Sequence, residues 1–419
     1  MSKVETQLLF PKLQLWELRL TTQCYWLEEP LIMGSSDKLT DGSILVIGSG
    51  ISGVSCAYWL AKKGLGEIRM IDFEAQKAAS FRNCGHILTG TVESMAALSA
   101  IHGKELAKEL WQFSLQLCKE IEASINSLGL ECEYKKNGYL CVAIDEVEDQ
   151  EIKDSIQLLN SLGFDSQYYD SQKVASLGLK EVCGARFDPD CAKAHPVKFR
   201  NGILRSCLEQ GVQYFSNCEV REIVEKGEKI GVKTPAGHAF YDIVVIASNA
   251  YSPLFSDFFK AKKIVEPFRG QIITSAPLKK EFPIKCAHSF DHGYEYGLIT
   301  EDQRLMIGGW RNHVEGGERN SYELNPNPLI EKGLKDFTKK HYQIDESIKW
   351  DYSWSGIMAS SQTGLPFVGP CDDPRVFTCA GFTGHGFSWA HGCGNLLADI
   401  VAGNPIPSVA KYFNPRMLN

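Results

Sequence analysis

The sequence lacks several features that define large classes of proteins. It has 14 cysteines but no C-x-x-C pair, so their spacing predicts neither a zinc site nor a disulfide framework. No apolar run approaches the roughly 18–20 residues that a membrane span needs, and the first residues show no charged segment followed by an apolar stretch. We therefore expect a cytoplasmic protein with reduced thiols, no bound metal and no membrane span.

Clustered positive charge is also missing. Lys and Arg number 44 against 51 Asp and Glu, which gives a formal net charge of -7. Binding to nucleic acid requires clustered Lys and Arg that neutralise phosphates, so we expect small-molecule partners and no nucleic acid. The 44% of hydrophobic residues is typical of a globular protein, and a length of 419 residues favours two domains.

A glycine motif near the N-terminus is the clearest feature that is present. An apolar run at 43–47 predicts a buried parallel strand, and a G-x-G-x-x-G motif follows at Gly48, Gly50 and Gly53. An apolar helix is expected to continue to about Lys63. In such a turn the glycines permit a tight bend and the close approach of a pyrophosphate, which the helix N-terminus stabilises.

An acidic residue follows this motif at the spacing that a dinucleotide requires. A second expected strand at 68–71 ends at Asp72, nineteen residues after Gly53. A carboxylate there accepts hydrogen bonds from both ribose hydroxyls and disfavours a 2′-phosphate. The combination predicts binding of NAD or FAD, and the motif alone does not choose between them.

The rest of the chain indicates two interleaved domains. A buried strand at 243–247, followed by small residues at 248–250, continues the dinucleotide-binding sheet. The stretch "ECEYKKNGYLCVAI" predicts a hairpin with an Asn-Gly turn, and "FRGQIITSAP", "YEYGLITEDQRLMIGGW" and "IKWDYSWSGIM" are typical of short strands in a mixed or antiparallel sheet.

These patterns predict an α/β and α+β fold, in which a discontinuous Rossmann-like domain encloses a domain with a mixed or antiparallel sheet. The Rossmann-like domain is expected to comprise 43–130, 185–264 and 350–419, the inserted substrate domain 131–184 and 265–349, and a leader packed on the body 1–42.

A second glycine-rich stretch lies near the C-terminus. In "AGFTGHGF", Gly381, Gly384 and Gly386 follow an expected strand at 376–379 and precede a helix that begins near Ser388. Exposed backbone amides and a helix N-terminus here would stabilise the negative charge that develops on a reduced flavin ring. The alternative is a plain strand-to-helix turn with a packing histidine.

Four further motifs are "SFRNCGH" at 80, "AHPVKF" at 194, "RGQI" at 269 and "GFTGHGF" at 381. Together with the first glycine motif, they resemble the D-amino-acid oxidase-like FAD-dependent oxidoreductases, especially the branch of gamma-glutamylputrescine oxidase and of relatives of sarcosine and glycine oxidases. The resemblance implies oxidation of a C–N bond by hydride transfer to N5 of FAD. The imine then hydrolyses, and dioxygen or another acceptor reoxidises the flavin.

The motifs and the resemblance place the cofactor against a defined set of residues. The set comprises Gly48, Ser49, Gly50, Ile51, Ser52, Gly53, Asp72, Phe73, Ser80, Arg82, Asn83, Val220, Ala247, Asn249, Gly384, His385, Gly386 and Phe387. His86 and His385 are candidate catalytic side chains, although the implied hydride transfer requires no protein base. A packing role for each histidine is the alternative.

The chain also departs from the family that it resembles. Where sarcosine oxidases carry a lysine for the substrate carboxylate, this chain has Ser388, and no clear counterpart of their substrate-loop arginine stands around His86. Met306 stands at the position of their oxygen-activating lysine. No cysteine occurs between 351 and 370, where those enzymes attach their flavin, so we expect noncovalent FAD. The departures favour an amine or N-substituted substrate over a small free amino acid.

Aromatic residues are the candidates for substrate contacts. Tyr294, Tyr296, Trp310 and Trp354 are expected on strands of the substrate domain, where they could line an aromatic slot for an amine. Burial in the core is the alternative for each of them. The favoured function is therefore FAD-dependent oxidation of an amine or amino acid. Two alternatives stay open: an FAD-dependent 2-hydroxy-acid dehydrogenase and a flavin-binding protein without turnover.

Overall fold

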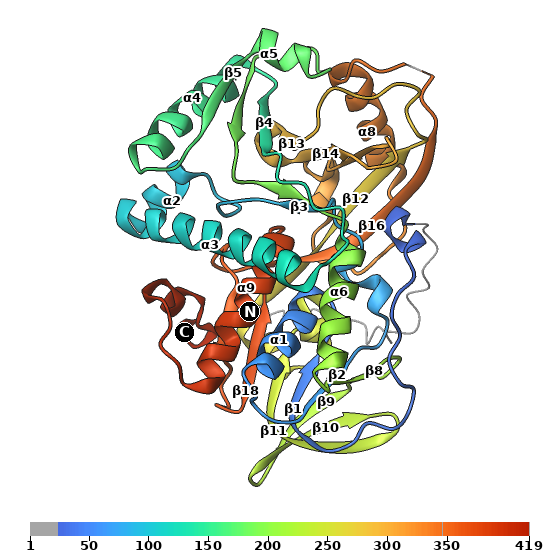
Figure 1. Ribbon diagram of the computed structural model, residues 1–419, viewed down its shortest axis with the longest axis vertical. Helices are drawn as coiled ribbons and strands as arrows, with labels where there is room; N and C mark the ends of the chain where they lie inside the picture. The colour runs from blue at the N-terminus through green and yellow to red at the C-terminus, as the bar shows by residue number, and fades with distance from the viewer. Residues whose placement is uncertain (1–23, 346, 419) are drawn as a thin grey trace, which may run out of the picture.

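The computed structural model describes residues 24–345 and 347–418, which form two eight-stranded sheets at opposite ends of the long axis (Figure 1). The first sheet has the order β17–β18–β11–β1–β2–β8, and β10 and β9 extend it from β11. Its strands are β1 (Gly42–Ile47), β2 (Ile68–Ile71), β8 (Gln213–Phe215), β9 (Glu222–Lys226), β10 (Lys229–Thr234), β11 (Gly237–Ile246), β17 (Phe367–Pro370) and β18 (Val376–Ala380).

Parallel pairing dominates the centre of the first sheet, where β1 lies between β2 and β11 and where β18 pairs with β11. Ile44 and Val46 of β1 face one apolar cluster, and Leu45 and Ile47 face another. The first cluster is formed with the helices α1 (Ile51–Lys62), α3 (Lys104–Leu128), α6 (Pro196–Glu209) and α9 (Gly386–Ala402). Burial on both faces explains why residues 44–47 of this strand are all apolar.

The second sheet has the order β16–β12–β15–β14–β13–β4–β6–β5. Its neighbouring strands are antiparallel except β13 and β4, which are parallel. The strands are β4 (Tyr139–Ala143), β5 (Gln167–Asp170), β6 (Gly184–Asp188), β12 (Val265–Ser275), β13 (Ala287–Phe290), β14 (Glu295–Ile299), β15 (Leu305–Gly308) and β16 (Trp350–Ser361). The α/β class and the mixed second sheet that the sequence predicts are confirmed.

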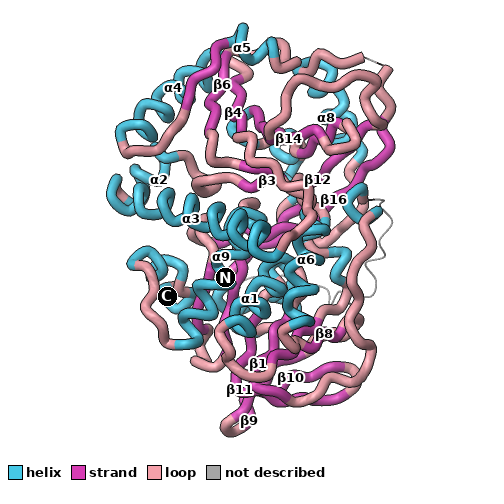
Figure 2. The backbone as a smooth tube through the Cα atoms, viewed as in Figure 1, coloured by secondary structure: helices cyan, strands magenta, loops and turns pink. Residues whose placement is uncertain are grey.

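Shorter elements cover and connect the sheets. Helix α4 (Glu146–Ser161) packs against β4 and β6, and α8 (Pro328–His341) packs against β12 and β15. Figure 2 shows α3 and β3 between the two sheets. The remaining elements are β3 (His86–Ile87), β7 (Ala192–Lys193), α2 (Met95–His102), α5 (Ser171–Ser176), α7 (Asp257–Lys262), and the 3-10 helices η2 (Tyr25–Glu28), η3 (Ala75–Lys77), η4 (Ala79–Phe81), η5 (Asn249–Leu254), η6 (Asp291–Gly293), η7 (Arg311–His313), η8 (Glu315–Glu318), η9 (Ser408–Phe413) and η10 (Pro415–Met417).

Local structure differs from the sequence expectations at two places. Asn137 and Gly138 form no hairpin turn, because β4 directly after them pairs with β6 and β13, strands that are distant in the sequence. The stretch "GVQYFSNCEVREI" also predicts a strand at Val220, but Val220 lies just before β9.

The sheets also show how the chain passes between the two halves. β16 and most of β6 belong to the second sheet, although they fall within 350–419 and 185–264, which are predicted for the dinucleotide-binding domain. The division of the chain into domains stays a prediction.

The predicted leader is described only in part, since residues 1–23 lie outside the described residues. Cys24 and Trp26 are buried, and Trp26 Nε1 donates a hydrogen bond to the carbonyl oxygen of Asn83 at 2.6 Å. The segment that starts at Cys24 therefore packs on the body of the protein.

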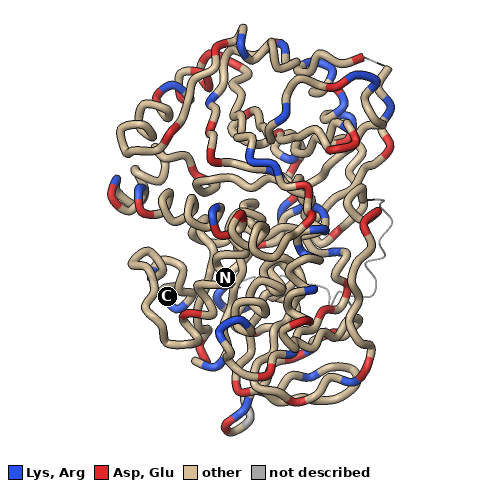
Figure 3. Tube along the Cα trace, viewed as in Figure 1, with Lys and Arg blue, Asp and Glu red and all other residues tan. Residues whose placement is uncertain are grey.

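Charged side chains of both signs are interspersed along both halves of the molecule (Figure 3). Within the described parts of the chain, no helix combines the length and the apolar character of a membrane span.

Candidate functional site

A cavity of about 1020 Å³ lies between the two sheets. Its lining includes the carboxyl ends of β1, β2 and β11, the loop before α9, and side chains of β4, β12 and β14. Ligands of open parallel sheets bind at the carboxyl ends of the strands, and small-molecule cavities measure about 300–1000 Å³. The cavity thus has the place and the size for a long ligand that extends from the first sheet to the second.

The loop from β1 to α1 is built for close backbone packing. Gly48 has φ +107°, and a Cβ there would lie 2.8 Å from the carbonyl oxygen of Ala247. A Cβ on Gly53 would lie only 1.8 Å from the carbonyl oxygen of Gly48, and one on Gly50 would lie 2.7 Å from Ser80 Oγ. Glycine alone fits at Gly48 and Gly53, where an added Cβ would meet backbone atoms, and the resulting turn directs the N-terminus of α1 at the cavity.

A buried arginine that the sequence analysis did not single out supports this loop from below. The Arg200 guanidinium on α6 donates to the carbonyl oxygen and to Oγ of Ser49, each at 2.8 Å. It also lies over the rings of Phe81 and Tyr214, with its central carbon 5.2 and 5.6 Å from the ring centroids. Ser49 accordingly faces Arg200 and does not line the cavity, and Arg200 fixes the shape of the glycine loop.

Asp72 lines the cavity at the end of β2, as the sequence predicts for a ribose-binding carboxylate. Its Oδ2 accepts a hydrogen bond from the Ser49 backbone N–H at 2.5 Å. Burial raises the pKa of the Asp72 carboxyl, against the lowering effects of that hydrogen bond and of Arg200. Phe73 and Val220 line the same part of the cavity.

The second glycine loop, between β18 and α9, also lines the cavity. Gly384, Gly386 and Phe387 all contribute to the lining, and Gly384 has φ +86°. His385 Nδ1 is buried without a hydrogen-bond partner among the described residues, and burial lowers the pKa of this imidazole. Ser388 Oγ accepts a hydrogen bond from the Leu88 backbone N–H at 2.7 Å, so α9 is tied to the segment after β3.

The "SFRNCGH" segment passes between the two sheets. Arg82 Nε donates to the carbonyl oxygen of Ser355 on β16 at 2.6 Å, and Asn83 Oδ1 accepts from the Gly85 N–H at 2.8 Å. Arg82 and Asn83 both line the cavity. Cys84, which stands where the family branch has glycine, also lines it, and burial raises the pKa of its thiol.

His86 is a neutral hydrogen-bond donor in this environment. Its Nε2 lies 3.0 Å from the carbonyl oxygen of Gly297 and therefore carries the ring proton. Burial, reinforced by nearby His288, lowers the pKa of His86 to about 3. The imidazole lines the cavity, with its centroid 6.2 Å from that of Tyr296.

The end of the cavity at the second sheet has fewer aromatic residues than the sequence analysis expects. Tyr294 and Tyr296 line it, but Trp310 and Trp354 do not. Trp354 is fully buried and donates its Nε1–H to the carbonyl oxygen of Arg82 at 3.1 Å, and Trp310 packs on His313 with ring centroids 4.1 Å apart. Both tryptophans point away from the cavity. Their orientation depends on contacts that form only in the folded chain, and the sequence does not reveal these contacts.

Arg311 supplies a positive charge at this end that the sequence analysis also missed. Its guanidinium lies over the rings of Phe268 and Tyr294, with the central carbon 4.9 and 5.2 Å from the two ring centroids, and all three residues line the cavity. Within residues 24–345 and 347–418, no carboxylate lies within ion-pair distance of this guanidinium. The only sequence signal was a basic residue directly after an expected strand and "GGW".

The cavity thus brings together most of the residues predicted from the sequence. Of the predicted cofactor set, Ser49 and Gly53 alone lie outside the lining, one beneath the loop and the other at the contact of α1 with β1. Glycines whose Cβ positions are occupied, an acid after β2, and a buried imidazole nitrogen without a partner fit a dinucleotide that carries a ring system. The residues that line both ends are therefore compatible with FAD.

Comparison with known proteins gives the same result. A family model described as "FAD dependent oxidoreductase" matches residues 43–400. The probable oxidoreductase OrdL of Haemophilus influenzae is 26% identical over 376 residues, which cover 88% of this chain and 84% of that protein. Gamma-glutamylputrescine oxidoreductase of Escherichia coli is 22% identical over 369 residues, which cover 86% of this chain and 84% of that protein.

Solved structures with the same fold include glycine oxidase from Geobacillus kaustophilus, with a TM-score of 0.77, 18% identity, and coverage of 91% of this chain and 99% of that chain. L-proline dehydrogenase from P. horikoshii has a TM-score of 0.74, 24% identity, and coverage of 90% of this chain and 98% of that chain. At such identities the structural matches establish the fold, and the family follows from the sequence match.

Proposed function

Since the chain belongs to the family of FAD dependent oxidoreductases, we propose that it oxidises a C–N bond of an amine that also carries a carboxylate, and that Arg311 binds this carboxylate. FAD, when bound, supplies the hydride acceptor at N5 and then passes the electrons to dioxygen or another acceptor. The proposed substrate is inferred from the residues at the second-sheet end of the cavity, which we call the substrate side.

Arg311 is the single observation that supports a carboxylate-bearing substrate. The planar guanidinium donates two parallel hydrogen bonds to a carboxylate, and such pairs are among the strongest in proteins. The Phe268 and Tyr294 rings hold the guanidinium at the cavity wall, where no described side chain neutralises it. Ser388 lacks the lysine charge of sarcosine oxidases, and Arg311 supplies a charge on the other side of the cavity.

His86 and the tyrosine rings would orient the reacting amine. Because His86 Nε2 donates to Gly297, its Nδ1 carries no proton and can accept an N–H hydrogen bond. The same ring stays uncharged at neutral pH, since its pKa is lowered to about 3, and so it does not repel an amine. A neutral amine can release hydride from carbon to leave a protonated imine, which water then hydrolyses to a carbonyl compound and the amine or ammonium.

A 2-hydroxy acid would satisfy Arg311 equally well but fits the remaining residues less. When a 2-hydroxy acid is oxidised, the carbon that carries the hydroxyl group loses hydride and the hydroxyl group loses its proton. A general base that removes this proton acts best with a pKa near the working pH. His86 is a weak base in this environment because its pKa lies far below that range. The amine reaction needs no such base, and this difference favours C–N oxidation.

The test is anaerobic bleaching of the bound flavin with matched substrates. We expect bleaching by N-substituted or free amino acids, weak bleaching by the same amines without their carboxylate, and an aldehyde or keto acid as product. Arg311→Met should raise KM for the carboxylate substrates roughly 100-fold and leave the amines without carboxylate unchanged. Arg319→Met, which alters an exposed arginine beyond η8, serves as the control.

Two results would contradict the proposal in different ways. Equal KM values for Arg311→Met and the natural protein would remove the carboxylate anchor while leaving C–N oxidation intact. A yellow protein that no substrate of any class bleaches would instead favour a flavin-binding protein without turnover.

A further inference from the structure

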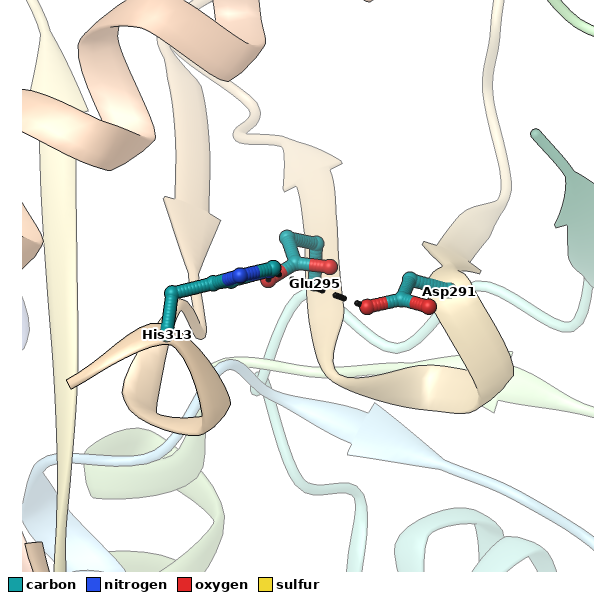
Figure 4. Close-up of side chains that lie close together, drawn as sticks. All are labelled: Asp291, Glu295 and His313. Carbon is teal, nitrogen blue, oxygen red and sulfur yellow. Dashed lines mark ion pairs between the residues drawn. The ribbon is translucent and has the colours of Figure 1, made fainter. Parts of the chain in front are cut away.

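Three side chains that could ligate a metal converge just behind the cavity wall. Asp291 in η6, Glu295 at the start of β14 and His313 in η7 each place one ligand atom within 4.8 Å of the others (Figure 4). His313 Nε2 lies 3.9 Å from Asp291 Oδ2 and 4.0 Å from Glu295 Oε1. Glu295 is buried, Asp291 is half-buried and His313 is exposed, so the group opens to solvent on one side.

One carboxylate of this group, that of Glu295, is buried with an oxygen that has no hydrogen-bond partner among the described residues. The residue is fully buried, and its Oε2 has no hydrogen-bond partner among the described residues. Its Oε1 accepts the backbone N–H of Trp310 at 3.1 Å. A buried carboxylate oxygen without a partner is rare in folded proteins because its lost hydration is not replaced.

The neighbouring groups do not neutralise these carboxylates. Asp291 Oδ2 accepts a hydrogen bond from Asn312 Nδ2 at 3.0 Å, a neutral donor. Among the described residues, His313 is the one basic side chain within ion-pair distance of Asp291 or Glu295. In Figure 4 the His313 imidazole on η7 faces the two carboxylates, which both lie on the segment that runs from η6 into β14.

We propose that Asp291, Glu295 and His313 bind a divalent metal ion and that zinc is the ion which suits them. Zinc accepts imidazole nitrogen and carboxylate oxygen at about 2.0–2.2 Å, which separates tetrahedral ligands by about 3.4 Å. The distances of 3.9 and 4.0 Å from His313 Nε2 exceed this value by about 0.5 Å, and small rotations of the three side chains would bring their ligand atoms closer together. An imidazole ligand disfavours Mg²⁺ and Ca²⁺, which prefer oxygen.

The ion would join the two turns that frame the substrate side. Asp291 lies three residues before Tyr294, and His313 lies two residues after Arg311. Tyr294 and Arg311 line the cavity and contact each other, whereas none of the three ligands lines it. The metal would therefore hold the turn that carries Arg311 against β14, and its binding does not depend on the reaction proposed above.

The test is a zinc titration of the flavin-loaded protein after treatment with a chelator, followed by calorimetry. We expect His313→Ala and Glu295→Gln each to abolish one equivalent of tight binding or to weaken it by at least about 100-fold. Glu315→Gln, an acidic neighbour in η8, and His102→Ala, a histidine on α2, are controls that should keep that equivalent. Because thiols also bind zinc, the result is the difference between variants, and Co²⁺ absorption reports the ligand type.

Each outcome decides for or against the site. Loss of one equivalent in His313→Ala and Glu295→Gln, with retention in both controls, supports it. Equal zinc stoichiometry and affinity in all variants would overturn it, as would displacement of zinc by Mg²⁺ at equal concentration. If Glu295→Gln fails to retain flavin, the exposed His313→Ala variant still decides, because the readout is metal binding and not turnover.

Discussion

The two ends of the cavity are lined by different kinds of atoms, backbone atoms at one end and side-chain atoms at the other. At the first sheet the backbone forms the site: Gly48, Gly50 and Gly53 leave no room for side chains. At the second sheet side chains form it, with Tyr296 and Arg311 as examples. A site of backbone atoms suits a ligand that does not vary, and a site of side chains can change with the substrate while the fold stays intact.

The two ends also differ in how completely their polar groups are satisfied. The loop at the first sheet is closed by Arg200 below it and by the hydrogen bond from Ser49 to Asp72. On the other side, Arg311 faces the cavity without a carboxylate partner and Glu295 Oε2 is buried without one. The loop from β1 to α1 is therefore organised before its ligand arrives, whereas ligands are needed to complete the second end.

Gly53→Ala should have the largest effect, because it tests the backbone end directly. The new Cβ would lie 1.8 Å from the carbonyl oxygen of Gly48, so α1 must move away from β1. We expect a loss of about 3 kcal/mol or more in the free energy of unfolding and a protein purified without flavin. Measurements are the ratio of visible to ultraviolet absorption and the thermal unfolding temperature.

Gly64→Ala at the end of the same helix is the matched control. This glycine has φ +68° but no atom within 4 Å of the added Cβ, so only the backbone strain of about 1–2 kcal/mol applies. Flavin binding should survive. Equal behaviour of the two variants would show that close packing at Gly53 is not essential.

Arg200→Met should have the next largest effect, since it leaves two oxygens of Ser49 without their charged donor. We expect a loss of about 2–4 kcal/mol in the free energy of unfolding together with weaker flavin binding, measured by denaturation and by flavin titration. Arg205→Met, on an exposed position of the same helix, should change neither quantity. Retained flavin affinity in Arg200→Met would mean that the loop keeps its shape without support from below.

Acid should weaken both ends in the same pH range. Burial lowers the pKa of His391 on α9 to about 3 and of His288 on β13 to about 4, whereas the unfolded residue titrates near 6.5. Between these values the unfolded chain binds more protons than the folded one. The free energy of unfolding therefore falls as pH falls, by about 1.4 kcal/mol per pH unit for each fully affected histidine.

The measurement is thermal unfolding from pH 8 to pH 4. We expect a constant midpoint above neutral pH and a steady decrease below about pH 6.5, with a shallower decrease in His391→Gln and in His288→Gln. His238→Gln, at an exposed position, should follow the natural protein. If only one of the two variants makes the unfolding midpoint less dependent on pH, then only the end of the molecule that contains this histidine is destabilised by acid.

Tyr296→Phe should have the smallest effect and should appear only in the kinetics. The ring lines the cavity, and removal of its hydroxyl changes one potential substrate contact worth about 1 kcal/mol, or about fivefold in KM. The unfolding temperature should stay the same, as in a Tyr412→Phe control. A markedly lower unfolding temperature in Tyr296→Phe would show that side chains at the second-sheet end also stabilise the fold, and would contradict the comparison between the two ends.

The dinucleotide end could be predicted because its information is local. Gly48, Gly50 and Gly53 lie within six residues, and Asp72 follows after one helix and one strand. This unit has few ways to fold, so spacing alone places its residues at the carboxyl edge of the sheet. The same reasoning located Gly384 and His385 at the loop before α9.

The substrate end could not be predicted in this way because it depends on contacts between distant segments. Arg311 reaches the cavity only because Phe268 and Tyr294, on other segments, hold its guanidinium, and Trp354 turns inward to the Arg82 carbonyl. The hairpin turn predicted at Asn137 and Gly138 is absent for the same reason, because β4 pairs with β6 and β13, which are distant in the sequence. Aromatic residues on expected strands do not reveal which face they occupy.

The order of the strands has a consequence for how the protein is made. β18 pairs directly with β11 near the middle of the first sheet, and α9 packs against α1, yet both come from the last part of the chain. A ribosome that has synthesised the first 375 residues holds β1, α1 and β2 with the first glycine loop, but the loop before α9 does not yet exist. The cavity is closed only after residues 376–402 have been made, so the newly made chain must stay soluble without its cofactor until then.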